Sequence, residues 1–205
     1  MQHYLKTAIA AALIVTGGCR NPFVPSTGVP VERPVESQRA TPQGLLSQLI
    51  EAYEGKDIEL YKDLFPKDSS FRFFVAPDFY DAFRLRHPLL SEPRDPRLRN
   101  LEASDFYYYW PQSVEIENHT KLFSPGVTID FTEKPYLQDV RPFIDEGDTA
   151  AELLVTGGVL EITRLVGDTA EIYITRVEKQ VMLVKQDSDN LWVLLKWYDF
   201  SKDGS

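Results

Sequence analysis

The chain has 205 residues, a length that suits one domain with appended segments. Hydrophobic residues make up 43% and aromatic residues 12%, enough for a packed core, and the net charge is -9. An acidic surface repels phosphate backbones, so the composition argues against nucleic-acid binding. The single cysteine, Cys19, excludes an intrachain disulfide.

Residues 1–18 have the pattern of a secretory signal peptide. Lys6 supplies a basic start, an apolar run covers residues 7–15, and small residues precede Cys19. The apolar run is too short to span a bilayer, which takes roughly 20 apolar residues. We therefore expect residues 1–18 to be removed rather than to form a membrane span.

The sequence Gly17-Gly18-Cys19 resembles the bacterial lipobox. The resemblance implies cleavage before Cys19, acylation of its sulfur and of the new amino terminus, and attachment to the membrane through the acyl chains. A plain secretory signal with a chance cysteine is the alternative. Arg20 stands where Asp would signal inner-membrane retention in enteric bacteria, which favours a lipid-anchored location in the cell envelope, at the outer membrane facing the periplasm.

Residues 19–41 are expected to form a tether. Five prolines between Arg20 and Pro42 prevent a helix or sheet from persisting, so the segment should be an extended spacer. The tether carries a net +1, and Lys6 leaves with the signal peptide, so residues 42–205 carry -11. We expect an acidic domain that stands off an anionic membrane.

Residues 42–205 predict a single α+β domain that begins with two helices. Thr41 is a good N-cap and Pro42 suits the first helical turn. Apolar residues then recur at helical spacing, and Gly55 is the expected C-terminal cap. Asp57 is expected to cap a second, short helix.

The next part of the chain predicts a strand at residues 71–75 and a helix that begins at Pro111. Between them, residues 78–99 are rich in Arg and Pro. We interpret this segment as a solvated loop with one helical turn, and a partner-binding or lid segment is the alternative.

Four strands follow, at residues 127–131, 151–163, 170–186 and 191–200. Gly157-Gly158 interrupts the second of these strands and predicts a bulge or sharp bend. Strict alternation along the last strand would place Trp192 and Trp197 on opposite faces, one toward the core or pocket and the other toward an interface.

The order of these elements resembles the nuclear transport factor two-like fold, which includes SnoaL-like and ketosteroid-isomerase-like proteins. The segments TPQGLLSQLIEAYEGKDIELYKDLF, SVEIENHTKLFSPG followed by VTIDF, and the ending DNLWVLLKWYDF carry the resemblance. It implies a cone, in which about three helices fill the concave face of a curved, mostly antiparallel sheet and leave a pocket at the wide end. Relatives include isomerases, cyclases, dehydratases and plain binding proteins, and many dimerise through the sheet face.

Catalytic signatures are lacking in the sequence. It has no Gly-rich phosphate loop, no paired-Cys or two-His metal spacing and no nucleophile elbow, so we expect no metal and no cofactor. His119 could act as a general base, or it could be a satisfied helix residue. Asp130 and Tyr136 match the isomerase relatives only by residue type, and Asp130 alternates with apolar neighbours, which favours a solvent-facing position.

The aromatic run at residues 107–110 either packs in the core or lines a pocket. On the second interpretation, the candidate ligand-binding residues are Tyr108, Tyr109, Trp110, His119 and Trp197. We favour a non-enzymatic, lipid-anchored envelope module that binds a small apolar ligand or an envelope protein, with a homodimer through the sheet face as a further expectation. The alternatives are a small isomerase- or cyclase-like enzyme, and an accessory subunit that docks through the sheet or through residues 78–99.

Overall fold

The computed structural model describes residues 38–75, 79–85, 88–145 and 147–203. The predicted signal peptide, Cys19 and most of the tether lie outside these residues. Within the described part, no helix is both long and apolar enough to cross a membrane. Packing begins slightly before residue 42, because the Trp192 N–H donates to the carbonyl of Arg39 at 2.9 Å.

Two helices open the domain, α2 (Pro42–Gly55) and α3 (Ile58–Lys62). The Thr41 hydroxyl oxygen accepts a hydrogen bond from the Gly44 N–H at 3.0 Å. Asp57 accepts two backbone hydrogen bonds at the start of α3 in the same way. Both predicted helix starts are therefore confirmed, and each cap satisfies donors that would otherwise lack a partner.

The end of α2 differs from the prediction. Lys56, and not Gly55, adopts the left-handed conformation, with φ at 49°. The Lys56 ammonium donates to the carbonyl of Val127 at 2.8 Å. This tertiary contact helps to hold a residue other than glycine in a conformation that costs it energy.

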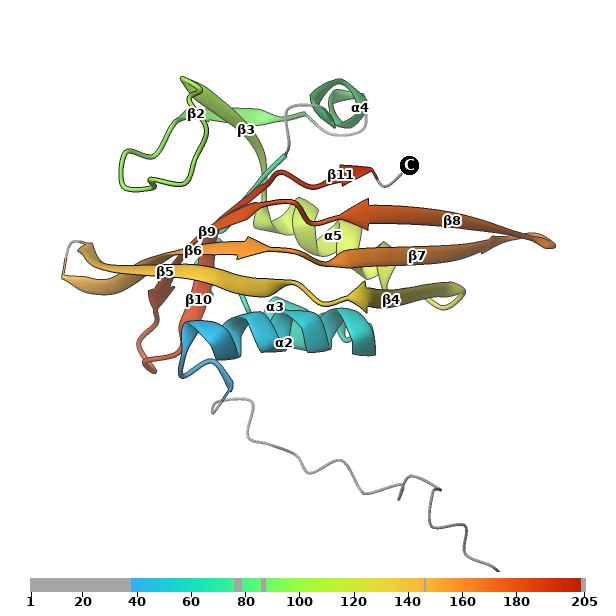
Figure 1. The fold of residues 1–205 in the computed structure, drawn as a ribbon, viewed down its shortest axis with the longest axis horizontal. Coiled ribbons are helices and arrows are strands. Elements are labelled where there is room, and N and C mark those ends of the chain that lie inside the picture. The colour runs from blue at the N-terminus through green and yellow to red at the C-terminus, as the bar shows by residue number, and fades with distance from the viewer. Residues whose placement is uncertain (1–37, 76–78, 86–87, 146, 204–205) are drawn as a thin grey trace, which may run out of the picture. The chain divides into compact units, whose positions relative to one another are not determined.

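Three long hairpin strands are each interrupted once, so that each contributes to two sheets (Figure 1). The interrupted strands are β4 (Val127–Glu133) with β5 (Tyr136–Asp145), β6 (Asp148–Thr156) with β7 (Val159–Val166), and β8 (Thr169–Arg176) with β9 (Gln180–Gln186). Gly157 and Gly158, with φ of 64° and 114°, lie between β6 and β7. The predicted bend is therefore confirmed, at a backbone conformation that favours glycine.

The remaining elements are β1 (Arg72–Phe74), α4 (Tyr80–Arg84), β2 (Leu90–Pro93), β3 (Phe106–Pro111), α5 (Gln112–Leu122), β10 (Trp192–Asp199) and β11 (Lys202–Asp203). One sheet has the order β2-β3-β1-β10-β9-β6-β5, and the other has β11-β8-β7-β4. Only the β1–β10 pair is parallel among the described strands. The predicted class is confirmed: helices pack on one face of a curved, mostly antiparallel sheet.

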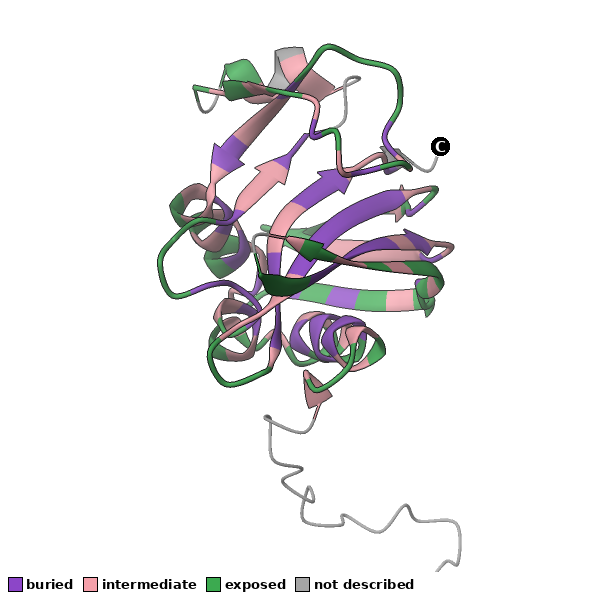
Figure 2. Cartoon of the chain, turned by 90° about the vertical axis from the view of Figure 1, so that its left-hand side faces the viewer, coloured by how far each residue is buried: buried purple, intermediate pink, exposed green. Residues whose placement is uncertain are grey.

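The large sheet buries both of its faces, and Figure 2 shows its central strands as buried. The inner face carries Leu153, Met182 and Leu194, on which α2 and α3 pack. The outer face carries a second cluster, which includes Leu183 and Tyr198. The chain's own residues cover this second cluster (Leu98, Leu101 and Tyr107). These residues shield this part of the outer face from solvent.

The prediction for the two tryptophans of β10 is wrong. Trp192 and Trp197 belong to the same inner cluster, with 7% and 4% of their surfaces exposed. The register shifts between Leu194 and Lys196, where a β-bulge inserts one residue. The bulge reverses the alternation, so that Trp197 returns to the inner face while Lys196 points outward with Tyr198.

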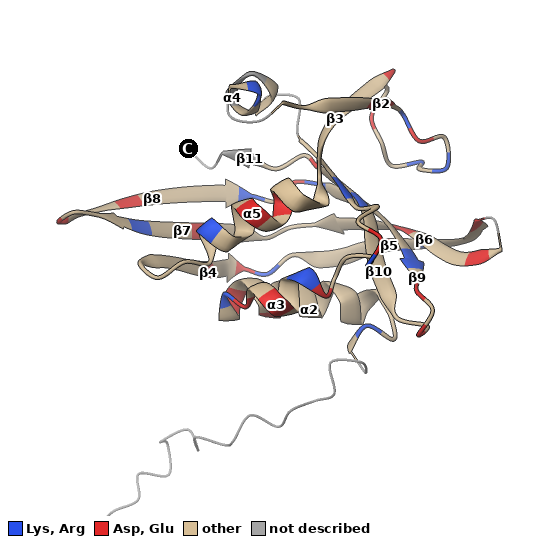
Figure 3. Ribbon diagram, turned by 180° about the vertical axis from the view of Figure 1, so that it is seen from behind, with Lys and Arg blue, Asp and Glu red and all other residues tan. Residues whose placement is uncertain are grey.

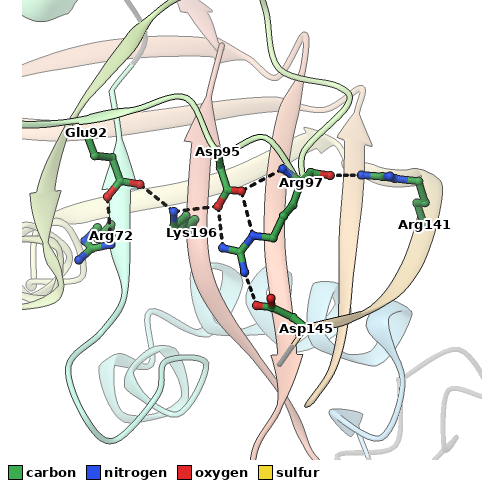
Figure 4. Close-up of polar contacts among 7 residues, drawn as sticks. All are labelled: Arg72, Glu92, Asp95, Arg97, Arg141, Asp145 and Lys196. Carbon is green, nitrogen blue, oxygen red and sulfur yellow. Dashed lines mark hydrogen bonds and ion pairs between the residues drawn. The ribbon is translucent and has the colours of Figure 1, made fainter. Parts of the chain in front are cut away.

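An ion-pair network fixes the Arg-rich segment to the outer face (Figure 4). Lys196 lies 2.7 Å from Glu92 and 2.9 Å from Asp95. Asp95 also pairs with Arg97 at 2.7 Å, and Arg97 reaches Asp145 at the end of β5. The helical turn predicted in this segment is α4, but the segment is not simply a solvated loop: it also contains β2, and Leu98 near its end belongs to the cluster on the outer face.

Candidate functional site

A cleft of about 1120 Å³ lies against the inner face of the bent sheet, with side chains from α2, α4 and α5 around it. Three aromatic rings form a row along one wall. Phe73 is the strand partner of both Trp110 and Trp197, so the three side chains align across β3, β1 and β10. The Phe73 ring stacks on Trp110 with centroids 4.9 Å apart and meets Trp197 edge-on at 5.3 Å.

Phe83 of α4 extends this aromatic row, 4.9 Å from Trp110. The indole N–H of Trp197 has no acceptor among the described residues, although Trp197 is buried. A buried donor without a partner is costly and uncommon in folded proteins. The row therefore combines four packed aromatic rings with one unused hydrogen-bond donor.

Glu115 of α5 is fully buried at the base of the cleft and accepts hydrogen bonds on both oxygens. The Tyr61 hydroxyl donates to Oε1 at 2.6 Å, and the Trp110 indole N–H donates to Oε2 at 2.5 Å. The donors come from α3 and β3, so this one carboxyl joins three elements. Because both oxygens are occupied, the role of Glu115 is to hold the aromatic wall in place.

His119 lies one turn after Glu115 on the same helix face. Its Nδ1 lies 3.1 Å from the Glu115 backbone carbonyl, and its Nε2 lies 2.6 Å from the Tyr53 hydroxyl. The carbonyl can only accept, so Nδ1 carries the hydrogen and Nε2 accepts from Tyr53. Burial lowers the pKa of His119, and the Glu115 carboxylate opposes this effect only in part. His119 is therefore neutral near physiological pH and already has partners for both nitrogens.

Asp199, at the end of β10, is a carboxyl group that the network around Glu115 does not use. It follows Trp197 by two positions, so both side chains point to the same face of the strand and line the cleft. Burial raises the pKa of Asp199 above its usual range, although hydrogen bonds from Ser201 and Gln180 act in the opposite direction. A perturbed carboxyl in an apolar cleft is a candidate functional group.

Three of the five predicted ligand-binding residues line the cleft: Trp110, His119 and Trp197. Tyr108 and Tyr109 do not. Tyr109 packs with the outer cluster beneath Arg72, whose guanidinium carbon lies 5.3 Å from the ring centroid. Tyr108 meets Tyr80 of α4 instead. The run of four aromatics thus divides between the two faces of β3, as strand alternation requires.

Sequence reasoning missed Tyr53, Glu115 and Asp199. Glu115 stands four residues before His119 on a helix, and Asp199 stands two residues after Trp197 on a strand. Both spacings could have placed these carboxyls beside the predicted residues. Asp130, predicted to face solvent, is exposed as expected, and Tyr136 is 59% exposed. Neither is among the residues that line the cleft.

Charged residues elsewhere on the described surface are mixed in sign. Acidic and basic side chains both occur on α3 and α5 (Figure 3). A second hollow, of about 580 Å³ near the β9–β10 turn, is lined by lysines and aspartates together. Among the described residues, no group of three or more His, Cys, Asp or Glu could hold a metal ion. The larger, aromatic cleft is therefore the better candidate site.

Comparisons with known proteins show likeness in structure alone. No family model and no curated protein matches the chain. A conserved protein from Planctomyces limnophilus DSM 3776 superposes with a TM-score of 0.50 at 11% identity, over 78% of this chain and 92% of that one. At that identity, the likeness shows a shared fold and says nothing of activity.

Two other solved structures match less well. A ketosteroid isomerase-like protein from Erwinia carotovora atroseptica SCRI1043 gives a TM-score of 0.46 at 9% identity, over 82% of this chain and 97% of that one. A nuclear transport factor 2-like superfamily protein from Salmonella enterica serovar Typhimurium str. LT2 gives 0.43 at 10% identity, over 83% and 92%.

Proposed function

We propose that this domain binds a small, largely apolar ligand in the cleft on the inner face of the sheet. The row formed by Phe73, Trp110 and Trp197 is the observation that carries the proposal, because its three aligned rings line one wall of a cleft of about 1120 Å³. Ligand sites are typically concave and mostly apolar, with a few placed polar groups. Asp199 and the unused Trp197 indole N–H supply such groups.

Blocking the cleft tests this proposal. Thr175 lines the cleft from β8, whereas its neighbour Ile174 lies on the opposite face and is 38% exposed. Thr175→Trp should narrow the cleft and obstruct part of it, and Ile174→Trp places the same ring outside it. The probe is N-phenyl-1-naphthylamine, a neutral dye that fluoresces when it enters an apolar site.

We expect saturable dye binding by the unsubstituted domain and by Ile174→Trp, and at least a tenfold loss in Thr175→Trp, which corresponds to about 1.4 kcal/mol. Equal binding by all three proteins would place the dye elsewhere and contradict the proposal. No binding by any of them would favour an accessory subunit that docks through its surface.

We further propose that the chain is a lipoprotein of the cell envelope, anchored through acyl chains on Cys19 at the outer membrane. The lipobox-like sequence before Cys19 and the Pro-rich spacer support this location. Two or more acyl chains anchor a protein stably, whereas one alone is marginal. Cys19→Ser should abolish labelling by radioactive palmitate, and a labelled Cys19→Ser protein would refute the anchor.

An enzyme is the second candidate, and Asp199 favours it. A carboxyl with a raised pKa inside an apolar cleft is suited to proton transfer, because its pKa moves toward the working pH. A proton-transfer enzyme should exchange hydrogen for deuterium at the carbon beside a ketone carbonyl. Exchange that is lost in Asp199→Asn, with dye binding retained, would establish catalysis, and exchange no faster than in buffer would leave a binding protein.

A further inference from the structure

The two oxygens of the Asp199 carboxyl have different surroundings. All three donors from the protein go to Oδ1: the Ser201 hydroxyl at 2.5 Å, the Ser201 N–H at 3.0 Å and the Gln180 amide at 3.3 Å. No described residue donates to Oδ2. Because Oδ1 is held so firmly, Oδ2 is the oxygen that remains available to a ligand, and the carboxyl cannot rotate freely to exchange them.

Asp199 also lacks a counter-charge that other shielded carboxyls of this domain possess. Glu152 pairs with Arg141 at 2.7 Å, and Asp95 pairs with Arg97 and Lys196. In the described part of the chain, no Lys or Arg forms an ion pair with Asp199. Glu115 also has no Lys or Arg partner, but both of its oxygens accept hydrogen bonds, so Asp199 is distinguished by an open oxygen together with the missing counter-charge.

The two basic residues that line the cleft do not supply that cation. Lys121 pairs with Glu117 on the same face of α5, with 68% of its side chain exposed. Arg164 is an exposed residue near the end of β7. Both residues therefore face solvent rather than Asp199.

The surroundings of Asp199 favour a positive charge and disfavour a negative one. Trp197 shares its strand face, and aromatic faces attract cations through their quadrupole, best in tryptophan. Burial raises the pKa of the Tyr53 hydroxyl at the base of the cleft, and the carboxylates of Glu115 and Asp199 raise it further. The domain's charge of -11 would also draw cations toward it.

We propose that the cleft takes a ligand with an organic ammonium group on an apolar body, in which the ammonium pairs with Oδ2 of Asp199 and the apolar body lies on the aromatic row. The inference rests on the proposed function, since it specifies the chemical class of the ligand in the same cleft. An amine fits better than an alcohol, because it satisfies both the open oxygen and the missing charge.

Three probes of one shape and different charge test this inference. These are 2-phenylethylamine, which is cationic at neutral pH, 2-phenylethanol, which is neutral, and 3-phenylpropionate, which is anionic. Their affinities are measured by displacement of N-phenyl-1-naphthylamine from the unsubstituted domain. We expect the amine to bind about tenfold more tightly than the alcohol, as one charge-assisted hydrogen bond allows, and the carboxylate to bind most weakly.

Two substitutions separate a local effect from the general negative field. Asp199→Asn keeps the shape of the side chain and should bring the amine-to-alcohol ratio close to one. Asp130→Asn, at an exposed position of β4 that does not line the cleft, removes the same charge and should leave the ratio unchanged. Dye binding by both variants shows that the cleft is intact. The amine-to-alcohol ratio of the unsubstituted domain is a separate test, which does not depend on how any variant folds.

The outcomes also distinguish this inference from the proposed function. If the dye binds and the alcohol competes as well as the amine, the cleft binds apolar ligands but the cation site is refuted. If Asp130→Asn reduces the preference for the amine as much as Asp199→Asn does, the preference comes from the domain's overall negative charge, and the cation site is likewise refuted. If the dye does not bind to the unsubstituted domain, the proposed function fails and the inference fails with it.

Discussion

The ammonium of Lys196 lies 2.9 Å from Oδ2 of Asp95, and this contact joins the last long strand to a segment 101 residues earlier in the chain. Only 14% of the Lys196 side chain and 3% of the Asp95 side chain are exposed. Lys196 reaches this partner because the β-bulge of β10 turns it to the outer face. The same bulge turns Trp197 into the cleft. One irregularity of β10 therefore determines which side chains reach the cleft and which reach the outer ion pairs.

Removing the cation should destabilise the domain. Lys196→Met keeps most of the apolar stem but leaves Asp95 without one of its two cations, and we expect a loss of about 3 kcal/mol in the free energy of unfolding. Lys62→Met is the matched control, since Lys62 forms an exposed pair with Glu59 that is worth about 0.5 kcal/mol or less. Urea melts measure both changes, and equal losses would contradict the structural role of Lys196.

Asp95 should make the domain sensitive to acid. Hydrogen bonds and charges from Arg97 and Lys196 lower the pKa of Asp95 in the folded protein, despite the opposing effect of burial. A lowered folded pKa gives stability that is present above the unfolded value of about 3.9 and is lost as the pH falls through the folded value. We expect the unsubstituted domain to lose stability below about pH 4, and Asp95→Asn, already weaker at neutral pH, to lose less. If urea melts show that both proteins lose the same stability as the pH falls, Asp95 is not a source of the acid sensitivity.

Glu115 should be needed for the aromatic wall. In Glu115→Gln, one oxygen is replaced by an NH₂ group that cannot accept from Tyr61 or Trp110, so a buried donor loses its partner. We expect a loss of about 1–3 kcal/mol in urea melts. Glu117→Gln makes the same change at an exposed position of α5 and should cost less than about 0.5 kcal/mol. A tolerated Glu115→Gln would argue against the role we assign to the carboxyl.

Asp199 should make the stability of the domain depend on pH in the direction opposite to that of Asp95. Its folded pKa is raised, so its most favourable contribution is present below the unfolded value of about 3.9 and is lost as the pH rises through the folded value. Asp199→Asn removes this penalty and should stabilise the domain at neutral pH, with the gain fading toward about pH 3. Thermal melts across this range provide the check, and a destabilised variant at neutral pH would show that the carboxylate is favoured in the fold.

Regular local signals made much of the fold predictable from sequence. Thr41 and Asp57 are caps whose side chains bond to their own helices, and Gly157-Gly158 marks a bend that few other residues accept. β5 escaped prediction because most of its residues are exposed or half-buried, so no apolar alternation marks it. β2 is short and ends in Pro93, which has no backbone N–H to donate to a neighbouring strand. Proline therefore argues against a strand when only the sequence is known.

The site was less predictable, because it depends on which strands lie side by side. Trp110 and Trp197 are 87 positions apart, and only the pairing of β1 with both β3 and β10 aligns them with Phe73. The β-bulge in β10 changed the face of Trp197 without leaving a local sequence signal. The interest of Asp199 likewise comes from its open Oδ2 beside Trp197 in the cleft, which only the three-dimensional structure shows.

The indole N–H signals of the three tryptophans in a nitrogen–proton NMR spectrum test the central claim most directly. Trp110 and Trp197 line the cleft, whereas Trp192, although it belongs to the same inner cluster as Trp197, does not line it and is an internal control. On titration with 2-phenylethanol, we predict that the signals of Trp110 and Trp197 move together and saturate while that of Trp192 stays in place. If all three signals move alike, or if none moves while the domain remains folded, the cleft is not a ligand site and the account is wrong.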